Sequence, residues 1–113
     1  MLNRTVYALV PALLLVGCSG NVQNPVDRFT FRDEPLVRDV ENGMPQARVL
    51  AIGGEPSRTS ARAVVPGLCH DYILNHDGKQ QPYYVSFDGA GRVDGQGFLT
   101  CKQLEENQRN LRR

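Results

Sequence analysis

Apolar positions in the middle of the chain recur at helical spacing and predict two short helices. The positions that share a face are Leu36, Val37 and Val40 in the first helix, and Val49, Ile52 and Gly53 in the second. Asn42-Gly43 ends the first helix, because glycine readily adopts the left-handed conformation common at helix C-termini. Pro45 suits the first position of the second helix, which Gly53-Gly54-Glu55-Pro56 ends.

Beyond a polar loop at residues 57–67, the apolar period becomes alternating, which is typical of strands with one buried face. The alternating positions are Tyr72 and Leu74 in the first strand, and Tyr83, Val85 and Phe87 in the second. Asp77-Gly78 and Asp88-Gly89 supply turn residues after these strands, and a third strand begins near Arg92-Val93. The pattern predicts an α+β domain in which two short helices pack on one face of a three-stranded antiparallel sheet.

The N-terminus has the pattern of a secretory signal. Arg4 precedes an apolar run from Val6 to Val16, which is too short for a stable membrane-spanning anchor. The run leads into Leu15-Val16-Gly17-Cys18, which is similar to a bacterial lipobox, whose cysteine carries a diacylglycerol. We therefore predict a lipoprotein signal peptide at residues 1–17 and lipid attachment at Cys18, which anchors the protein to a membrane without spanning it. Ser19 in place of Asp favours sorting to the outer membrane.

The predicted organisation is one small domain between two polar segments. A lipidated cysteine and a flexible tether occupy residues 18–35, the domain occupies residues 36–101, and a polar C-terminal tail occupies residues 102–113. The 113 residues carry a formal charge of +1, and loss of Arg4 with the signal peptide leaves equal numbers of basic and acidic side chains. A chain so balanced lacks the excess of basic residues typical of nucleic-acid-binding proteins, so no nucleic-acid partner is predicted.

Short motifs in a fixed order resemble a known lipoprotein family. They are Gly43-Met44, Val49, Gly54-Glu55-Pro56, Cys69, Tyr72-Ile73-Leu74, Tyr83-Tyr84-Val85, Asp88 to Val93 and Thr100-Cys101. From about Asp27 to Cys101, the chain is similar to the osmotically inducible lipoprotein E family, part of the SmpA/OmlA group whose best-known fold is that of BamE. Pro45 departs from the family pattern, which more often has Ser or Thr there as a helix cap.

The resemblance implies an outer-membrane lipoprotein of the osmotic or envelope stress response, with an ααβββ domain and no known catalysis. We expect a periplasmic, lipid-anchored interaction module whose partners are outer-membrane or β-barrel assembly proteins. The residues expected to contact partners are Met44, Glu55, Pro56 and Arg92. The edge of the third strand, from Arg92 to Phe98, can accept another strand. The alternative is a structural envelope protein that binds peptidoglycan or anionic lipid, the latter through Arg58, Arg62 and Arg92.

Cys69 and Cys101 remain once Cys18 is lipidated, and two interpretations of this pair stay open. The periplasm is oxidising, so a disulfide is the natural expectation, and its closed loop would stabilise the domain by about 3–4 kcal/mol. In a plain meander, however, Cys69 opens the first strand and Cys101 closes the third, about 10 Å away, whereas a disulfide needs Cα atoms within about 7 Å. The bond requires the chain to bend back after Gly95 or Gly97; otherwise both are separate buried thiols.

Three groups of residues suggest a chemical site, but a structural role explains each group better. Cys69-His70-Asp71 contains a nucleophile, a base and an acid, but neighbours on a strand point to opposite faces, so no catalysis is predicted. The candidate metal ligands are His70, Asp71, His76 and Asp77. They lack the compact spacing of a zinc site, so neither a metal nor another cofactor is predicted. Tyr72, Tyr83 and Tyr84 could form a platform that binds sugar or peptidoglycan. Aromatic residues that alternate along strands are usually core residues, so we predict that these three are buried.

Overall fold

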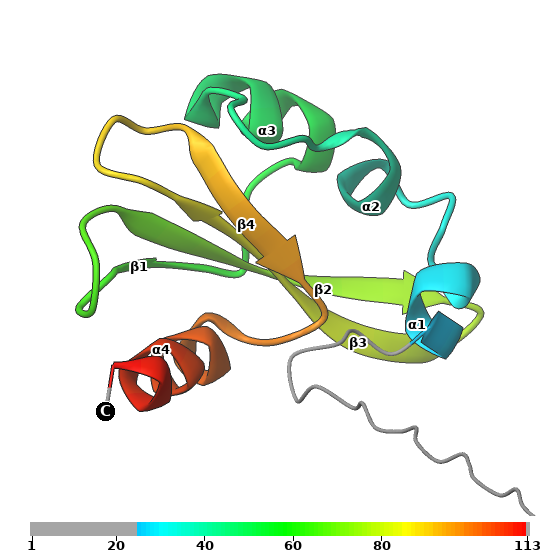
Figure 1. Cartoon of the computed structure of the whole chain (residues 1–113). Helices are drawn as coiled ribbons and strands as arrows, with labels where there is room; N and C mark the ends of the chain where they lie inside the picture. The colour runs from blue at the N-terminus through cyan, green and yellow to red at the C-terminus, as the bar shows by residue number, and fades with distance from the viewer. Residues whose placement is uncertain (1–24, 113) are drawn as a thin grey trace, which may run out of the picture.

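The computed structural model describes residues 25–112, which form a four-stranded antiparallel sheet with helices on both faces (Figure 1). The strands follow chain order as β1 (Arg58–Ala61), β2 (Leu68–His76), β3 (Lys79–Phe87) and β4 (Val93–Gly97). The helices are α1 (Pro25–Thr30), α2 (Pro35–Asp39), α3 (Gln46–Gly53) and α4 (Cys101–Leu111). The predicted α+β class is confirmed, but the sheet has one more strand than predicted, and α4 lies on the face opposite α2 and α3.

The long hairpin of β2 and β3 forms the centre of the sheet. Tyr72 pairs with Tyr83, and the predicted turn at Asp77-Gly78 joins the two strands directly. β1 and β4 flank only the half of the hairpin that is remote from this turn. Ile73 and Pro82 therefore pair with each other beyond the ends of both outer strands. This position explains how Pro82, which has no N–H to donate, fits into β3.

The larger apolar cluster lies between the sheet and the first three helices. Its buried members are Phe31, Leu36, Val40, Val49, Tyr72, Leu74, Tyr83, Val85, Phe87, Val93 and Phe98. Tyr83 and Phe98 pack edge to face, with ring centroids 4.9 Å apart. α2 and α3 approach closely at Gly53, where any side chain would run into Leu36. The predicted helical and alternating faces are thus the ones that the fold buries.

The prediction of a flexible tether is wrong for residues 25–35, which fold against the sheet. α1 lies in this segment, and Phe31, which follows it, is 1% exposed. Asp27 is also buried, and its carboxylate accepts a hydrogen bond from Gln81 Nε2 (3.0 Å). A single buried aromatic residue in a polar stretch produces no apolar period, which is why the sequence suggested a tether.

Two other elements lie in segments that were predicted to be a polar loop and a polar tail that frays or forms a solvated helix. β1 falls within the predicted polar loop, and it shows no apolar alternation because its residues are exposed or half-buried at the edge of the sheet. α4 begins at Cys101, the last residue of the predicted domain, and runs through the predicted tail; it buries Cys101 and Leu104, so the helix packs on the domain instead of being solvated all round. The first predicted helix also ends earlier, at Asp39, and Pro45 precedes α3 as its N-cap rather than opening it.

The predicted signal peptide, Cys18 and residues 19–24 lie outside the described residues. The lipid anchor therefore stays a prediction. Between residues 25 and 112, no helix has the length and apolar character needed to cross a membrane.

Candidate functional site

A disulfide holds α4 on the face of the sheet that lies opposite α2 and α3. It joins Cys69 on β2 to Cys101, the first residue of α4, with Cα atoms 6.0 Å apart. The chain leaves β4 at Gly97 and turns back over the sheet before α4 begins (Figure 1). The argument against the bond from a plain meander is therefore wrong. The smaller apolar cluster lies on this face and consists of Cys69, Tyr84, Cys101 and Leu104, with Leu99 packed against it.

Polar groups fix the first turn of α4 beside the disulfide. Asp71 Oδ1 accepts a hydrogen bond from the Cys101 N–H (2.7 Å). Thr100 and Gln103 form a capping box, in which each side chain accepts a hydrogen bond from the other residue's N–H. Sequence reasoning missed this helix start, although Thr100-x-x-Gln103 is the sequence signature of such a cap.

Arg62 connects the loop after β1 to β4. Its side chain is 1% exposed and forms an ion pair with Asp94 (2.8 Å). Asp94 is the extra residue of a bulge in β4, and the bulge directs its carboxylate toward Arg62 and the Ser86 hydroxyl, which donates to it (2.7 Å). Arg62 therefore stabilises the fold, and the prediction that it binds lipid headgroups is wrong.

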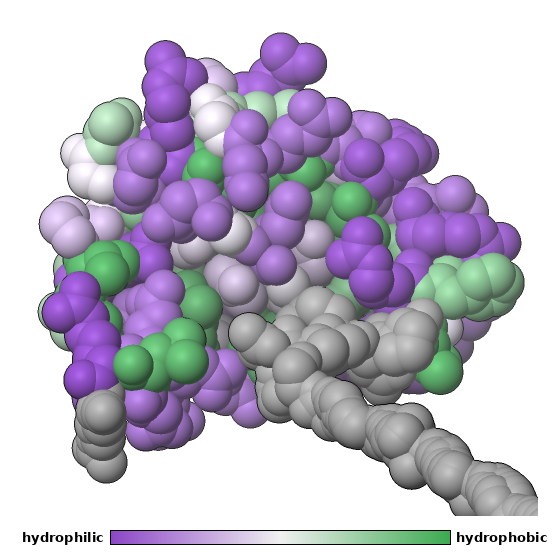
Figure 2. Space-filling view, viewed as in Figure 1, coloured by the Kyte–Doolittle hydropathy of each residue, from purple (hydrophilic) through white to green (hydrophobic). Residues whose placement is uncertain are grey.

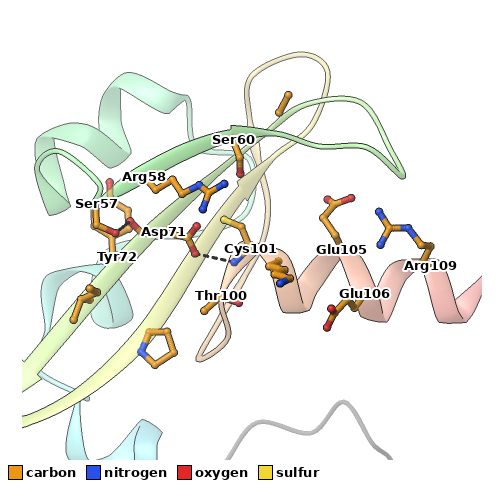
Figure 3. Close-up of a pocket in the computed structure, with 14 residues that line it drawn as sticks. Ser57, Arg58, Ser60, Asp71, Tyr72, Thr100, Cys101, Glu105, Glu106 and Arg109 are labelled. Atoms are coloured by element: carbon orange, nitrogen blue, oxygen red, sulfur yellow. Dashed lines mark hydrogen bonds between the residues drawn. The ribbon is translucent and has the colours of Figure 1, made fainter.

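A groove of about 610 Å³ lies between α4 and the strands β1 and β2 (Figure 3). Arg58 and Ser60 reach into it from β1, and Glu105 and Arg109 project from the α4 side. Glu105 already binds the neighbouring loop, since its Oε1 accepts hydrogen bonds from the N–H groups of residues 63 and 64, each 3.1 Å long. The groove was not predicted, because it depends on where α4 docks.

His70 lies on the face of β2 opposite Cys69 and Asp71, so the three residues do not assemble. Gln46 Nε2 lies 3.2 Å from His70 Nε2, and the Tyr72 hydroxyl lies 3.5 Å from His70 Nδ1 and donates to the Gly54 carbonyl (3.0 Å). Burial lowers the pKa of His70 from its usual value, and the Glu55 carboxylate acts in the opposite direction to a smaller extent. A buried imidazole held by two polar neighbours is a core residue of this fold.

The tyrosines are core residues, as the alternating pattern predicted. Tyr72, Tyr83 and Tyr84 are all buried. Burial raises the pKa of the Tyr83 hydroxyl to about 12. A sugar-binding platform needs exposed ring faces, which these residues do not offer.

The four predicted partner contacts lie in two places. Met44 and Arg92 lie together, because Pro45 and Arg92 form a bridge and the Val93 N–H donates to the Met44 carbonyl (2.8 Å). Glu55 and Pro56 follow the far end of α3, which is eight residues long. Met44 is half-buried and packs against the core, whereas Arg92 and Glu55 are exposed.

The predicted open edge of β4 is partly closed. The Gly43 N–H donates to the Val93 carbonyl (2.8 Å), so residues 43–45 cover the start of β4, where Arg92 Nη1 also donates to the Gly43 carbonyl (2.8 Å). Gln96 Nε2 donates to the Val40 carbonyl further along (3.0 Å). The prediction that a strand adds along Arg92 to Phe98 is therefore wrong where residues 43–45 already pair with it.

The surface is predominantly polar, with apolar residues in separate patches on the face that Figure 2 shows. The exposed large apolar residues are Val26, Phe29, Ile73 and Leu111. Within the described part of the chain, no group of three or more His, Cys, Asp or Glu side chains is arranged to hold a metal ion.

Residues 30–97 match the outer membrane protein assembly factor BamE domain family. Over 93 residues, the chain is 36% identical to the osmotically-inducible putative lipoprotein OsmE of Escherichia coli strain K12 and to that of strain O157:H7, covering 81% of this chain and 80% of each relative. A crystal structure of a putative osmotically inducible lipoprotein OsmE is 61% identical, with a TM-score of 0.75, and the match covers 79% of this chain and 94% of that one. The chain therefore belongs to the OsmE lipoprotein family, within the BamE domain family.

Proposed function

We propose that this chain is a lipoprotein of the cell envelope, anchored through Cys18 at the periplasmic face of the outer membrane, and that it acts as a non-enzymatic interaction module. The observation that carries the proposal is the match of residues 30–97 to the outer membrane protein assembly factor BamE domain. The names of the OsmE relatives add osmotic induction and lipidation. Together they support a role in outer-membrane protein assembly or in envelope integrity under stress.

The chemistry of the domain supports binding rather than catalysis. Cys69 and Cys101 are joined to each other, which suits an oxidising compartment such as the periplasm. Asp71 caps α4, and His70 is buried on the other face. The reactive side chains that the sequence offered are thus already engaged in holding the fold.

Arg92 is the best residue with which to test the proposed partner surface. It is exposed, it lies beside Met44 at the start of β4, and it lacks an acidic partner within residues 25–112. Arg48 on α3 is a matched control, because it is also an exposed arginine.

The test is to purify the tagged chain from gently solubilised membranes after mild cross-linking and to identify co-purifying proteins by mass spectrometry. β-Barrel assembly proteins should co-purify with the natural chain, less so with Cys18→Ala and Arg92→Glu, and undiminished with Arg48→Glu. An intact mass without acyl chains would contradict the anchor. Absence of any specific protein would instead favour a structural envelope protein that binds anionic lipid through Arg58 and Arg92, or peptidoglycan.

A further inference from the structure

α1 carries two apolar side chains on its exposed face. Val26 and Phe29 are 59% and 67% exposed, and they lie about one helical turn apart, so they share a face of the helix. The other face of α1 is held on the domain, because the Asp27 carboxylate accepts a hydrogen bond from Gln81 Nε2 (3.0 Å) and lies 3.7 Å from Lys79 Nζ. α1 is therefore fixed on the sheet with its apolar face outward.

Basic side chains flank this apolar face. The Arg32 guanidinium lies over the Phe29 ring, with Cζ 4.1 Å from the ring centroid, and its Nη1 donates to the Phe29 carbonyl (2.7 Å). Arg28, within α1, is also exposed. Apolar and aromatic side chains beside long basic ones are typical of helices that lie in the interface of a bilayer, where the basic side chains extend toward the headgroups.

The position of α1 in the chain identifies the surface that covers this face. Pro25 begins α1, and the predicted lipid on Cys18 is seven residues earlier. Seven residues span at most about 25 Å when fully extended, so the start of α1 lies within that distance of the anchored cysteine. A tether this short keeps the bilayer at a high effective concentration beside α1, and weak insertion is then enough.

The charges around α1 do not select an anionic lipid. Arg28 and Arg32 are offset by Asp33 and Glu34, which follow the helix. The carboxylate within α1 pairs with Lys79. Burial of apolar surface, which does not depend on headgroup charge, is therefore the interaction that this face offers to a bilayer.

β3 relates α1 to the surface proposed to contact partners. Lys79, the first residue of β3, contacts α1, whereas Phe87, the last, pairs with Val93 beside Arg92. A strand of this length spans about 27 Å. α1 and the surface around Met44 and Arg92 therefore lie at opposite ends of the sheet (Figure 1).

We propose that Val26 and Phe29 insert into the interface of the membrane that holds the lipid on Cys18, so that α1 lies on the bilayer and the surface around Met44 and Arg92 is directed away from it. This inference rests on the anchor in the proposed function. The lipid alone leaves the orientation of the domain open, whereas α1 supplies a second contact that fixes it.

A tryptophan reporter tests the contact, because the chain has no tryptophan of its own. Phe29→Trp places the reporter on the exposed face of α1. Leu111→Trp is the matched control, since Leu111 is 81% exposed at the end of α4, remote from α1 (Figure 1). Each lipidated variant is reconstituted in phosphatidylcholine vesicles, with or without phosphatidylglycerol, that carry bromine at a shallow or a deep position of the acyl chains.

The emission of Phe29→Trp should shift to shorter wavelength on vesicles, and bromine should quench it. The two bromine positions should place the tryptophan about 5–10 Å into the boundary between headgroups and acyl chains. Val26→Ser added to Phe29→Trp should reduce this depth, and phosphatidylglycerol should leave it unchanged. Leu111→Trp should show neither the shift nor the quenching.

Vesicle flotation separates failure of this inference from failure of the anchor. Variants that float with the vesicles while bromine quenches both tryptophans alike, or neither, would keep the anchor and overturn the contact of α1. Failure to float would remove the anchor, and the contact with it. Quenching of Phe29→Trp that requires phosphatidylglycerol would overturn apolar insertion in favour of headgroup charge.

An occupant other than the bilayer has its own signature. Phe29→Trp combined with Cys18→Ala is measured without vesicles, where the tryptophan should emit as a solvent-exposed residue. Emission at short wavelength there would overturn the proposal, because the chain itself would already cover α1. Dependence of that emission on protein concentration would assign the face to a second copy, and independence would assign it to a segment of the same chain.

Discussion

The two faces of the sheet are stabilised in different ways. The face under α1, α2 and α3 buries the larger apolar cluster, built from residues that recur at helical and strand periods. The α4 face buries four residues of the smaller cluster, two of which are the disulfide-bonded cysteines. The remaining attachments of this face are polar: the cap from Asp71, the Glu105 contact with the loop after β1, and the ion pair of the buried Arg62 with Asp94.

This difference separates what holds the fold from what shapes the groove. Burial of apolar surface is non-directional, and it tolerates small shifts of the helices that provide it. The disulfide and the charge-assisted hydrogen bonds are directional, and they fix α4 and the β1–β2 loop at one distance from each other. We infer that substitutions in the core of the first face alter global stability alone, whereas substitutions that break the directional bonds of the second face alter the groove as well as global stability.

The largest expected loss comes from the core of the first face. Phe87 is fully buried there, so Phe87→Ala should lower the free energy of unfolding by about 3–5 kcal/mol. Ile73→Ala is the matched change on the other face, where the side chain is mostly exposed, and it should cost less than about 0.5 kcal/mol. Urea unfolding followed by circular dichroism measures both. Equal losses would contradict the division between the faces.

Removal of the disulfide should give the next largest effect. Cys69 and Cys101 are 32 residues apart, and a loop of this length is expected to contribute about 3–4 kcal/mol by restricting the unfolded chain. Cys69→Ala with Cys101→Ala should therefore lower the unfolding midpoint, and the variant should no longer respond to reductant. If reductant lowers the unfolding midpoint of the variant as much as that of the natural chain, the reductant does not act through the Cys69–Cys101 bond.

The ion pair between the buried Arg62 and the partly exposed Asp94 should show an asymmetric effect. Asp94→Ala leaves the Arg62 guanidinium buried without its carboxylate and should cost about 2 kcal/mol, less than for a fully buried pair because Asp94 is partly exposed. Arg62→Met should cost less, because Asp94 still accepts a hydrogen bond from Ser86 and reaches solvent. Asp39→Asn, which removes the exposed Arg38–Asp39 pair, should leave the unfolding midpoint unchanged. Equal effects of Asp94→Ala and Arg62→Met would contradict this account.

The smallest expected effect is a pH dependence from His70. Burial lowers the pKa of His70 in the folded chain, so below the usual value of 6.5 the unfolded chain binds a proton that the folded chain does not. The stability that His70 contributes is present above pH 6.5, and it is lost as the pH falls toward the lower pKa of the folded chain. Unfolding measured between pH 7.5 and about 5 should show a steeper loss for the natural chain than for His70→Gln. Parallel curves would show that His70 does not titrate as inferred.

The first face could be predicted from the sequence because periodicity reports burial. Leu36 and Val49 mark their helices, and Tyr83, Val85 and Phe87 mark β3. In each element the buried positions recur along the sequence at the spacing of a helix or of a strand. The turn at Asp77-Gly78 was predicted from residue chemistry alone.

The second face could not be predicted in the same way. β1 is an exposed edge strand, and α4 buries few apolar residues, so neither produces a period. The Cys69–Cys101 bond depends on how the chain turns after β4, which no local pattern reports. Thr100 and Gln103 carried the one local signal for the start of α4, in their capping-box spacing. The groove follows from the position of α4, and it was missed with the helix.

Hydrogen exchange with mass spectrometry on the purified chain, with and without reductant, tests the contrast between the two faces most directly. After reduction, the amides of α4 and of β1 with its following loop should lose protection first. Those of α3 and the central part of β3 should stay protected, because the apolar cluster holds them. Simultaneous loss of protection on both faces, or unchanged protection of α4, would contradict the claim that directional bonds hold the second face independently of the core.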